Sequence, residues 1–98
     1  MKNLFQQLDK AFENKIRLGT MSVLLVNSQA SFNDLKDLLE VTDGNLASHL
    51  KHLEKEEYIS VRKSFINRKP NTVYTITEKG KLAFEKHLNA LEELLKQR

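Results

Sequence analysis

The fold of this chain is decided by the segment Ser31-Phe-Asn-Asp-Leu-Lys-Asp-Leu-Leu-Glu-Val-Thr-Asp-Gly-Asn-Leu-Ala-Ser-His-Leu50. Ser31 and Thr42 each stand immediately before an apolar pattern with helical spacing. A hydroxyl side chain in that position accepts a hydrogen bond from the free N–H groups of a first helical turn. The segment therefore predicts a helix over residues 32–39 and another over residues 43–56, joined by a tight turn.

A basic two-stranded ribbon is predicted to follow, between Tyr58 and Ile76. Ile59, Val61 and Phe65 alternate with polar residues, which is the period of a strand with one buried face and one wet face. Proline and asparagine in residues 66–71 indicate a turn, and residues 72–76 are expected to form the return strand. The ribbon contains no acidic residue, and its positive charges are Arg62, Lys63, Arg68 and Lys69.

Amphipathic helices are predicted on both sides of this central part. Apolar residues recur at helical spacing from Lys2 to Phe12, and a second helix is expected over residues 14–27. Thr77 is in position to cap a last helix. That helix carries a seam with the alternating steps of a short coiled coil, formed by Phe84, Leu88, Leu91 and Leu95. The chain is therefore expected to be mainly α-helical with one small β-hairpin.

The composition indicates a single small domain over residues 1–98. Of the 98 residues, 40% are hydrophobic and 30% are charged, which is enough for a modest core. The net charge of +3 is only mildly basic, so the clustering of charge in the ribbon is more informative than the total. The lack of cysteine and of a signal peptide suits the cytoplasm, and no stretch is apolar for long enough to cross a membrane.

Motifs of catalysis or cofactor binding are absent from the sequence. It has no glycine-rich phosphate loop, no nucleophile motif and no set of metal ligands. His49 and His52 are close in the sequence, but without cysteine or suitably placed acids they are expected to be solvated or to face phosphate. We therefore expect no enzyme, no cofactor and no metal site.

The exposed side of the helix over residues 43–56 is the candidate binding surface. With Leu46, Leu50 and Leu53 on the buried edge, an advance of about 100° per residue turns the polar residues outward. Small hydrogen-bonding groups come first on this face and positive charge follows, in the order Asn45, Ser48, Lys51, His52 and Lys55. That order suits a helix that enters a DNA groove with its N-terminus first, where Asn45 and Ser48 would meet base edges.

Some of these residues have more than one interpretation. Thr42 and the helix N-terminus favour a nearby phosphate. Asp43 either caps the helix, which is the preferred role, or accepts a hydrogen bond from cytosine. The polar face alone also fits ordinary solvated surface, and Arg68 with Lys69 fits a hairpin tip that discourages edge-to-edge pairing. The functional interpretation depends on all these elements occurring in one order.

The segment from Phe32 to Ile59, with Thr42-Asp-Gly-Asn-Leu-Ala-Ser-His-Leu50 at its centre, resembles the helix-turn-helix of small winged-helix transcriptional regulators. The segment Thr72-Val-Tyr-Thr-Ile-Thr-Glu-Lys-Gly80 is similar to the second wing strand and the next helix start of these proteins. They form a stand-alone family near the MarR and ArsR groups. The resemblance implies a winged helix-turn-helix with a three-helix core, a wing, and long N- and C-terminal helices.

The resemblance also implies a sequence-specific, dimeric DNA-binding regulator, usually a repressor, acting on a pseudo-palindromic operator. Helix 43–56 would then lie in the major groove, and residues 62–71 of the wing would lie on the flanking backbone. The DNA-binding residues would be Thr42, Asn45, Ser48, Lys51, His52, Lys55, Arg62, Lys63, Arg68 and Lys69. The chain lacks the cysteine or clustered histidine ligands of the metal-sensing ArsR branch.

Surplus apolar surface near the chain ends predicts a homodimer. Two copies would read two half-sites about one helical turn apart, which one small domain cannot do. We expect residues 1–13 and 78–98 to form the dimerisation helices, although these helices could instead pack on their own domain. The expected interface residues are Leu4, Phe5, Leu8, Phe12, Phe84, Leu88, Leu91 and Leu95.

A protein-interaction module that uses the same scaffold without DNA is the alternative function. An apolar groove in place of the polar helix face would favour that alternative. The expected partners are double-stranded DNA and a second copy of the chain, with no membrane. Control by a small-molecule effector and control by protein concentration alone are both open at this point.

Overall fold

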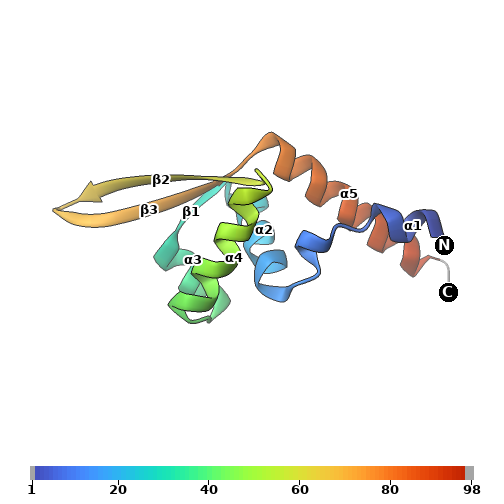
Figure 1. The fold of residues 1–98 in the computed structure, drawn as a ribbon, viewed down its shortest axis with the longest axis horizontal. Helices are drawn as coiled ribbons and strands as arrows, with labels where there is room; N and C mark the ends of the chain where they lie inside the picture. Colours follow the sequence, from blue (N-terminus) through green and yellow to red (C-terminus); the bar gives the residue numbers. More distant parts are fainter. Residues whose placement is uncertain (1, 97–98) are drawn as a thin grey trace.

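The computed structural model describes residues 2–96 of the chain. A helical body carries a long β-hairpin at one end and a helix pair at the other, so the molecule measures 53 × 25 × 21 Å (Figure 1). The elements follow in the order α1 (Lys2–Gln7), the 3-10 helix η1 (Lys10–Phe12), α2 (Lys15–Asn27), β1 (Gln29–Ser31), α3 (Phe32–Leu39), α4 (Asp43–Lys55), β2 (Ile59–Ile66), β3 (Lys69–Ile76) and α5 (Glu78–Leu95).

The two central helices begin where the sequence predicts. The Ser31 hydroxyl accepts a hydrogen bond from the Asp34 N–H at 3.0 Å, and the Asp34 carboxylate accepts the Ser31 N–H in return, which is a capping box. Thr42 caps α4 by accepting the Asn45 N–H at 3.3 Å. Leu46, Leu50 and Leu53 are almost completely buried, as expected for the inner edge of α4.

The sheet has three antiparallel strands in the order β1-β3-β2, so the predicted two-stranded ribbon is incomplete. The sequence predicts no strand between α2 and α3, but Gln29–Ser31 pairs with β3, with Ala30 opposite Tyr74. Because β1 has only three residues, its strand character comes from the partner strand and leaves no periodic signal in the sequence. The pairing fixes the base of the hairpin to the segment that joins α2 to α3.

The turn of the hairpin is tighter than predicted. Asn67 and Arg68 have φ angles of 52° and 66°, which is the left-handed geometry of a two-residue turn between twisted strands. β2 therefore continues to Ile66 and β3 already begins at Lys69, whereas the sequence predicts a turn over residues 66–71. We call the hairpin formed by β2 and β3 the wing.

Pro70 is compatible with β3 because of its register. Residues that flank a two-residue turn form a hydrogen-bonded pair, so the next pair, Phe65 and Pro70, is not hydrogen-bonded. The proline nitrogen consequently faces away from β2. On that other side β1 reaches β3 only between Val73 and Thr75, so no ladder bond is lost at Pro70.

The N-terminal segment is not one long helix. α1 ends at Gln7, and the Asp9 carboxylate then caps η1 by accepting the Ala11 N–H at 2.9 Å. The break is stabilised from α5, because the Asp9 N–H donates to Nδ1 of His87 at 2.9 Å. The expected long N-terminal helix is therefore wrong, and the short α1 lies along α5 of the same chain (Figure 1).

Two residues assigned to the dimer interface belong to the core of the protomer. Phe12 is 2% exposed and Phe84 is 1% exposed, and their rings meet edge to face with centroids 5.1 Å apart. Tyr58 and His87 pack on the same phenylalanine, each with a ring centroid 5.3 Å from that of Phe12. Part of the apolar stripe of each terminal segment therefore packs into the core of the same chain. Phe12 and Phe84 are buried there and cannot contact a partner.

Candidate nucleic-acid interface

α4 presents a polar face to solvent opposite its buried leucines. The predicted residues Asn45, Ser48, Lys51, His52 and Lys55 are all exposed, together with Asp43 and Ala47. The helix has one acidic residue in its first turn and His52 and Lys55 in its last turn, a distribution that suits the helix dipole. The structure therefore confirms the outward orientation of this face, while its contact with DNA stays a prediction.

The start of α4 is fixed by two different side chains. Thr42 is the cap, and Asp43 instead pairs with Lys36 of α3, with 2.9 Å between Nζ and Oδ1. The hydrogen bond to Asp43 and its negative charge raise the pKa of Lys36. The preferred capping role of Asp43 is therefore wrong, and this residue links α3 to α4 across the turn. Thr42 and Asp43 are both exposed, so the Thr42 side chain stays accessible at the N-terminus of α4.

Arg17 of α2 adds a cation beside α4 that the sequence analysis does not single out. Its Nη1 lies 2.9 Å from Nδ1 of His49, and its Nε donates to the Ala11 carbonyl oxygen at 2.6 Å. Burial lowers the pKa of His49, and the charge of Arg17 lowers it further, so this histidine accepts the hydrogen bond as a neutral ring. The pair joins residues 32 positions apart, and nothing in the local pattern around Arg17 predicts it.

A groove of about 500 Å³ separates α4 from the wing. Its α4 side is formed by Ala47, Ser48, Lys51 and Glu54, and its wing side by Val61, Lys63 and Tyr74. Three predicted site residues, Ser48, Lys51 and Lys63, are therefore brought to one surface from two elements. Glu54 also lines this groove, and its charge adds to burial in raising the pKa of Tyr74. A carboxylate here disfavours phosphate and can accept a hydrogen bond from a base amino group.

The cations of the wing are divided between its two faces. Successive residues of a strand point to opposite faces, so Arg62 cannot share the groove side with Lys63. Lys69 is paired with Ile66, which lies on the same face as Arg62, and it therefore joins Arg62 on the outer side. Arg68 is in the turn. All four side chains are exposed, but they surround the wing and do not form a single patch.

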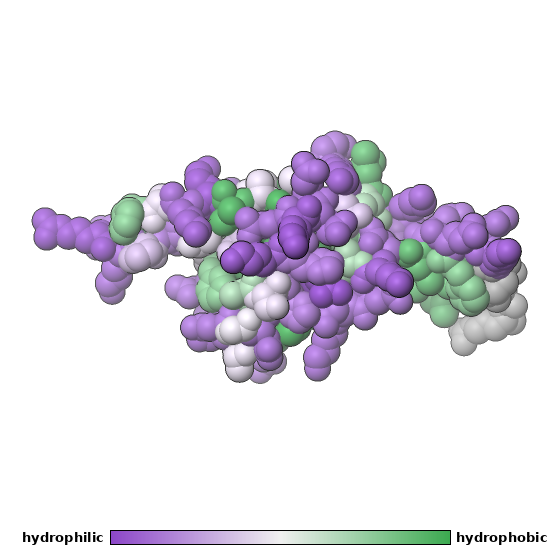
Figure 2. All heavy atoms as spheres, in the orientation of Figure 1, coloured by the Kyte–Doolittle hydropathy of each residue, from purple (hydrophilic) through white to green (hydrophobic). Residues whose placement is uncertain are grey.

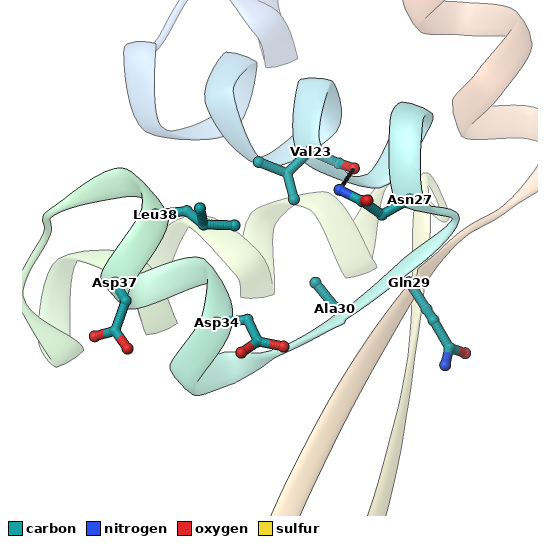
Figure 3. A pocket seen from close by; sticks show the side chains of 7 residues that line it. All are labelled: Val23, Asn27, Gln29, Ala30, Asp34, Asp37 and Leu38. Atoms are coloured by element: carbon teal, nitrogen blue, oxygen red, sulfur yellow. Dashed lines mark hydrogen bonds between the residues drawn. The ribbon is translucent and has the colours of Figure 1, made fainter.

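A second hollow, of about 420 Å³, lies between α2, β1 and α3 (Figure 3). It is lined by Val23, Asn27, Gln29, Ala30, Asp34, Asp37 and Leu38. Two carboxylates and no cation line it, so its charge disfavours a nucleic acid. Within residues 2–96 no group of three or more histidine and acidic side chains is placed to hold a metal ion. No helix of this part of the chain is long and apolar enough to span a membrane.

Two short helices, the second with a polar exposed face, followed by a basic two-stranded wing whose base pairs with β1, define a winged helix-turn-helix. The chain belongs to the winged helix DNA-binding domain family, which matches residues 16–95. This confirms the family expected from residues 32–59 and 72–80.

Relatives of known sequence or structure agree with this assignment. An uncharacterised protein of Methanocaldococcus jannaschii, MJ0432, is 36% identical over 87 residues, which cover 89% of this chain and 95% of the relative. The transcriptional regulator homologue of Pyrococcus horikoshii OT3 superposes with a TM-score of 0.90 at 31% identity, covering 99% of this chain and 97% of that one. HlyU of Vibrio cholerae N16961 gives a TM-score of 0.67 at 26% identity, with 86% and 87% covered.

Proposed function

We propose that this protein is a sequence-specific transcriptional repressor that binds DNA as a homodimer in the cytoplasm. The observation that carries the proposal is the groove in which Ser48 and Lys51 of α4 meet Lys63 of the wing. α4 lies in the major groove, with Asn45 and Ser48 at base edges and Lys51, His52 and Lys55 along the rest of the contact. The wing, residues 62–71, lies on the flanking backbone.

The polar character of α4 supports DNA over a protein partner at this surface. Interfaces between proteins are depleted in charge at their centre, and lysine in particular is disfavoured there. The middle of the exposed α4 face carries Lys51 and His52 beside the acid-free wing. A polyanion matches that surface, whereas a protein partner would leave the charge of Lys51 desolvated.

Apolar side chains on the helix pair α1 and α5 support the homodimer. Phe5 is 58% exposed, Leu88 and Leu91 are each 37% exposed, and Leu95 is 63% exposed. Leu4 and Leu8 are half-buried, and α1 lies against α5, so one protomer offers a surface built from both helices. Figure 2 shows hydrophobic side chains gathered at this end of the molecule. A two-fold dimer uses the same surface on both copies, so such an assembly would carry two α4 helices, one for each half-site.

Selection of bound sequences from a random duplex pool, followed by fluorescence anisotropy, tests the proposal. We expect one palindromic sequence to bind about 10³-fold more tightly than a scrambled duplex at the same salt concentration. Lys51→Ala should weaken binding, while Lys86→Ala, which removes the same charge from α5, should not. Equal affinity for all duplexes, or none at low salt, would contradict the proposal.

A further inference from the structure

An aromatic side chain near the end of the wing is exposed although its position in the strand predicts burial. Phe65 follows the alternation of Ile59 and Val61, yet 76% of its surface is exposed. The reason is that the wing extends beyond the helical body, so this part of β2 has nothing to pack on (Figure 1). Figure 2 shows a hydrophobic patch there, next to the hydrophilic end of the wing. A single exposed apolar side chain is ordinary on a protein surface, so what distinguishes Phe65 is where it lies and the charges around it.

The register places Phe65 on the groove side of the wing. Residues at alternate positions share a face, so Phe65 lies on the same side as Val61 and Lys63, which line the groove. Pro70 is directly opposite on β3 and shares that face. Ile66, which is 57% exposed, lies on the outer face and is not part of the same patch.

The spacing along β2 matches the dimensions of a duplex. A strand advances about 3.4 Å per residue, so Phe65 lies about 6.8 Å beyond Lys63 on the same face. The minor groove is about 6 Å wide between its two backbones. With Lys63 on one phosphate backbone, Phe65 is therefore about one groove width away, close enough for its ring to reach into the minor groove.

The charges around Phe65 favour a DNA duplex over a second copy of the wing as the partner of this surface. The segment from Tyr58 to Ile76 contains no acidic residue, and cations lie on both sides of Phe65 along the wing. A second wing would bring these like charges together, whereas a duplex neutralises them. Phe65 also follows Lys63, a lining residue of the groove beside α4, on the same face of β2.

We propose that Phe65, supported by Pro70, is an apolar wedge that enters the minor groove and partly unstacks one base step, so that DNA bends on binding. This inference rests on the proposed DNA-binding function. Apolar side chains inserted in this way kink duplexes by about 20–90°. Pyrimidine–purine steps unstack most easily, so the wing selects such a step without reading a base edge.

The test uses the full chain and its selected duplex, labelled at both ends for energy transfer and carrying 2-aminopurine at the flanking pyrimidine–purine step. Wild-type protein should shorten the end-to-end distance and raise the 2-aminopurine fluorescence. Phe65→Ala should abolish both signals and weaken binding roughly tenfold. Ile66→Ala is the matched control, because it removes a neighbouring exposed apolar side chain from the other face, and it should keep both signals.

The outcomes separate the two proposals. Binding by the wild type to straight DNA with unchanged 2-aminopurine fluorescence overturns the wedge and leaves the regulator proposal standing. Equal effects of Phe65→Ala and Ile66→Ala also overturn the wedge. No binding to any duplex overturns both. Because both side chains are exposed, their loss leaves the core intact, and circular dichroism verifies the fold of each variant.

Discussion

The hydroxyl of Tyr58 donates a hydrogen bond of 2.5 Å to the carboxylate of Asp9, which joins the N-terminal segment to the base of the wing. The backbone N–H of the same aspartate donates to His87 of α5. Asp9 is therefore held from two elements that are distant in sequence. Asp9 thus connects α5, which is part of the surface proposed for dimerisation, with the start of β2.

Replacing Tyr58 by phenylalanine should destabilise the protein by about 1–3 kcal/mol, because a partly buried carboxylate loses its hydrogen-bond donor. Urea unfolding followed by circular dichroism measures this change. Tyr74→Phe is the matched control, since Tyr74 is equally buried, and none of the hydrogen bonds described for residues 2–96 involves its hydroxyl. Equal losses in the two variants would show that the bond to Asp9 contributes nothing specific.

Stability should fall as the pH is lowered below the ordinary pKa of histidine, about 6.5. Nδ1 of His87 accepts the Asp9 N–H, so the folded state requires a neutral ring. Burial lowers the pKa of His87, although Asp9 and Glu13 oppose the shift. Between the lowered pKa and 6.5 the unfolded chain binds a proton that the folded chain does not, so the free energy of unfolding decreases with decreasing pH.

The matched variant for this pH dependence is His87→Gln, whose amide oxygen can accept the same N–H without titrating. Its free energy of unfolding should change less between pH 7.5 and pH 5.5 than that of the wild type. His49, whose pKa is also lowered, is present in both proteins and cancels in the comparison. Parallel curves for the two proteins would exclude His87 as the origin.

Local sequence signals predicted where the central helices begin. The features that were not predicted depend on contacts between residues far apart in the chain. Ser31, Thr42 and Thr77 cap helices through their own neighbours, so each start was predictable. The break at Asp9 depends on His87, 78 residues away, and no local pattern predicts it. Phe65 is the opposite case. The alternation of apolar residues along β2 predicts that it is buried, but the helical body does not extend as far as this residue.

Part of the candidate site was predictable from the sequence, and part depends on tertiary packing. The exposed row of α4 follows from helical periodicity with Leu46 on the buried side, and the structure confirms it. The pairing of Arg17 with His49, and the place of Glu54 in the groove, require the packing of α2 and the wing around α4. The division of Arg62 from Lys63 follows from strand alternation, which the sequence analysis did not apply to the charged residues.

Gly80→Ala should destabilise the protein by at least about 1–3 kcal/mol through overpacking. A Cβ on this buried residue would collide with the carbonyl oxygen of Tyr58, which accepts the Thr77 N–H at 3.1 Å. Gly44→Ala is the control, because a Cβ there meets nothing within 4 Å. That variant should leave stability unchanged or raise it slightly, since Gly44 is exposed in the first turn of α4. Thermal unfolding distinguishes them, and a harmless Gly80→Ala would contradict the tight contact.

Asn45→Ala and Arg68→Ala should impair DNA binding in different ways. Loss of a bidentate base contact by Asn45 should cost about 1–3 kcal/mol, and only on duplexes with the preferred base at one position. Loss of a phosphate contact by Arg68 should weaken binding to all duplexes and reduce the salt slope by about one unit. Anisotropy titrations over a salt series, on selected and scrambled duplexes, measure both. A uniform loss for Asn45→Ala would remove it from base recognition.

If the protein forms the proposed homodimer, Leu91→Glu should convert it to a monomer, because it places a charge in the apolar surface of α1 and α5. Light scattering coupled to size exclusion at micromolar concentration reports the mass. Leu82→Glu is the control, since Leu82 is an exposed leucine of the same helix outside the predicted seam. A wild-type protein that is already monomeric would contradict the proposed assembly.

Pro70 has a further consequence for the unbound protein. On the side away from β2, residues 69–72 of β3 pair with no other described strand, and an unpaired edge is a template on which another chain can add a strand. Proline presents no N–H to an added strand, and the lysines and arginines around it repel a second identical hairpin. The edge of β3 beside the exposed Phe65 is therefore a poor template for an added strand.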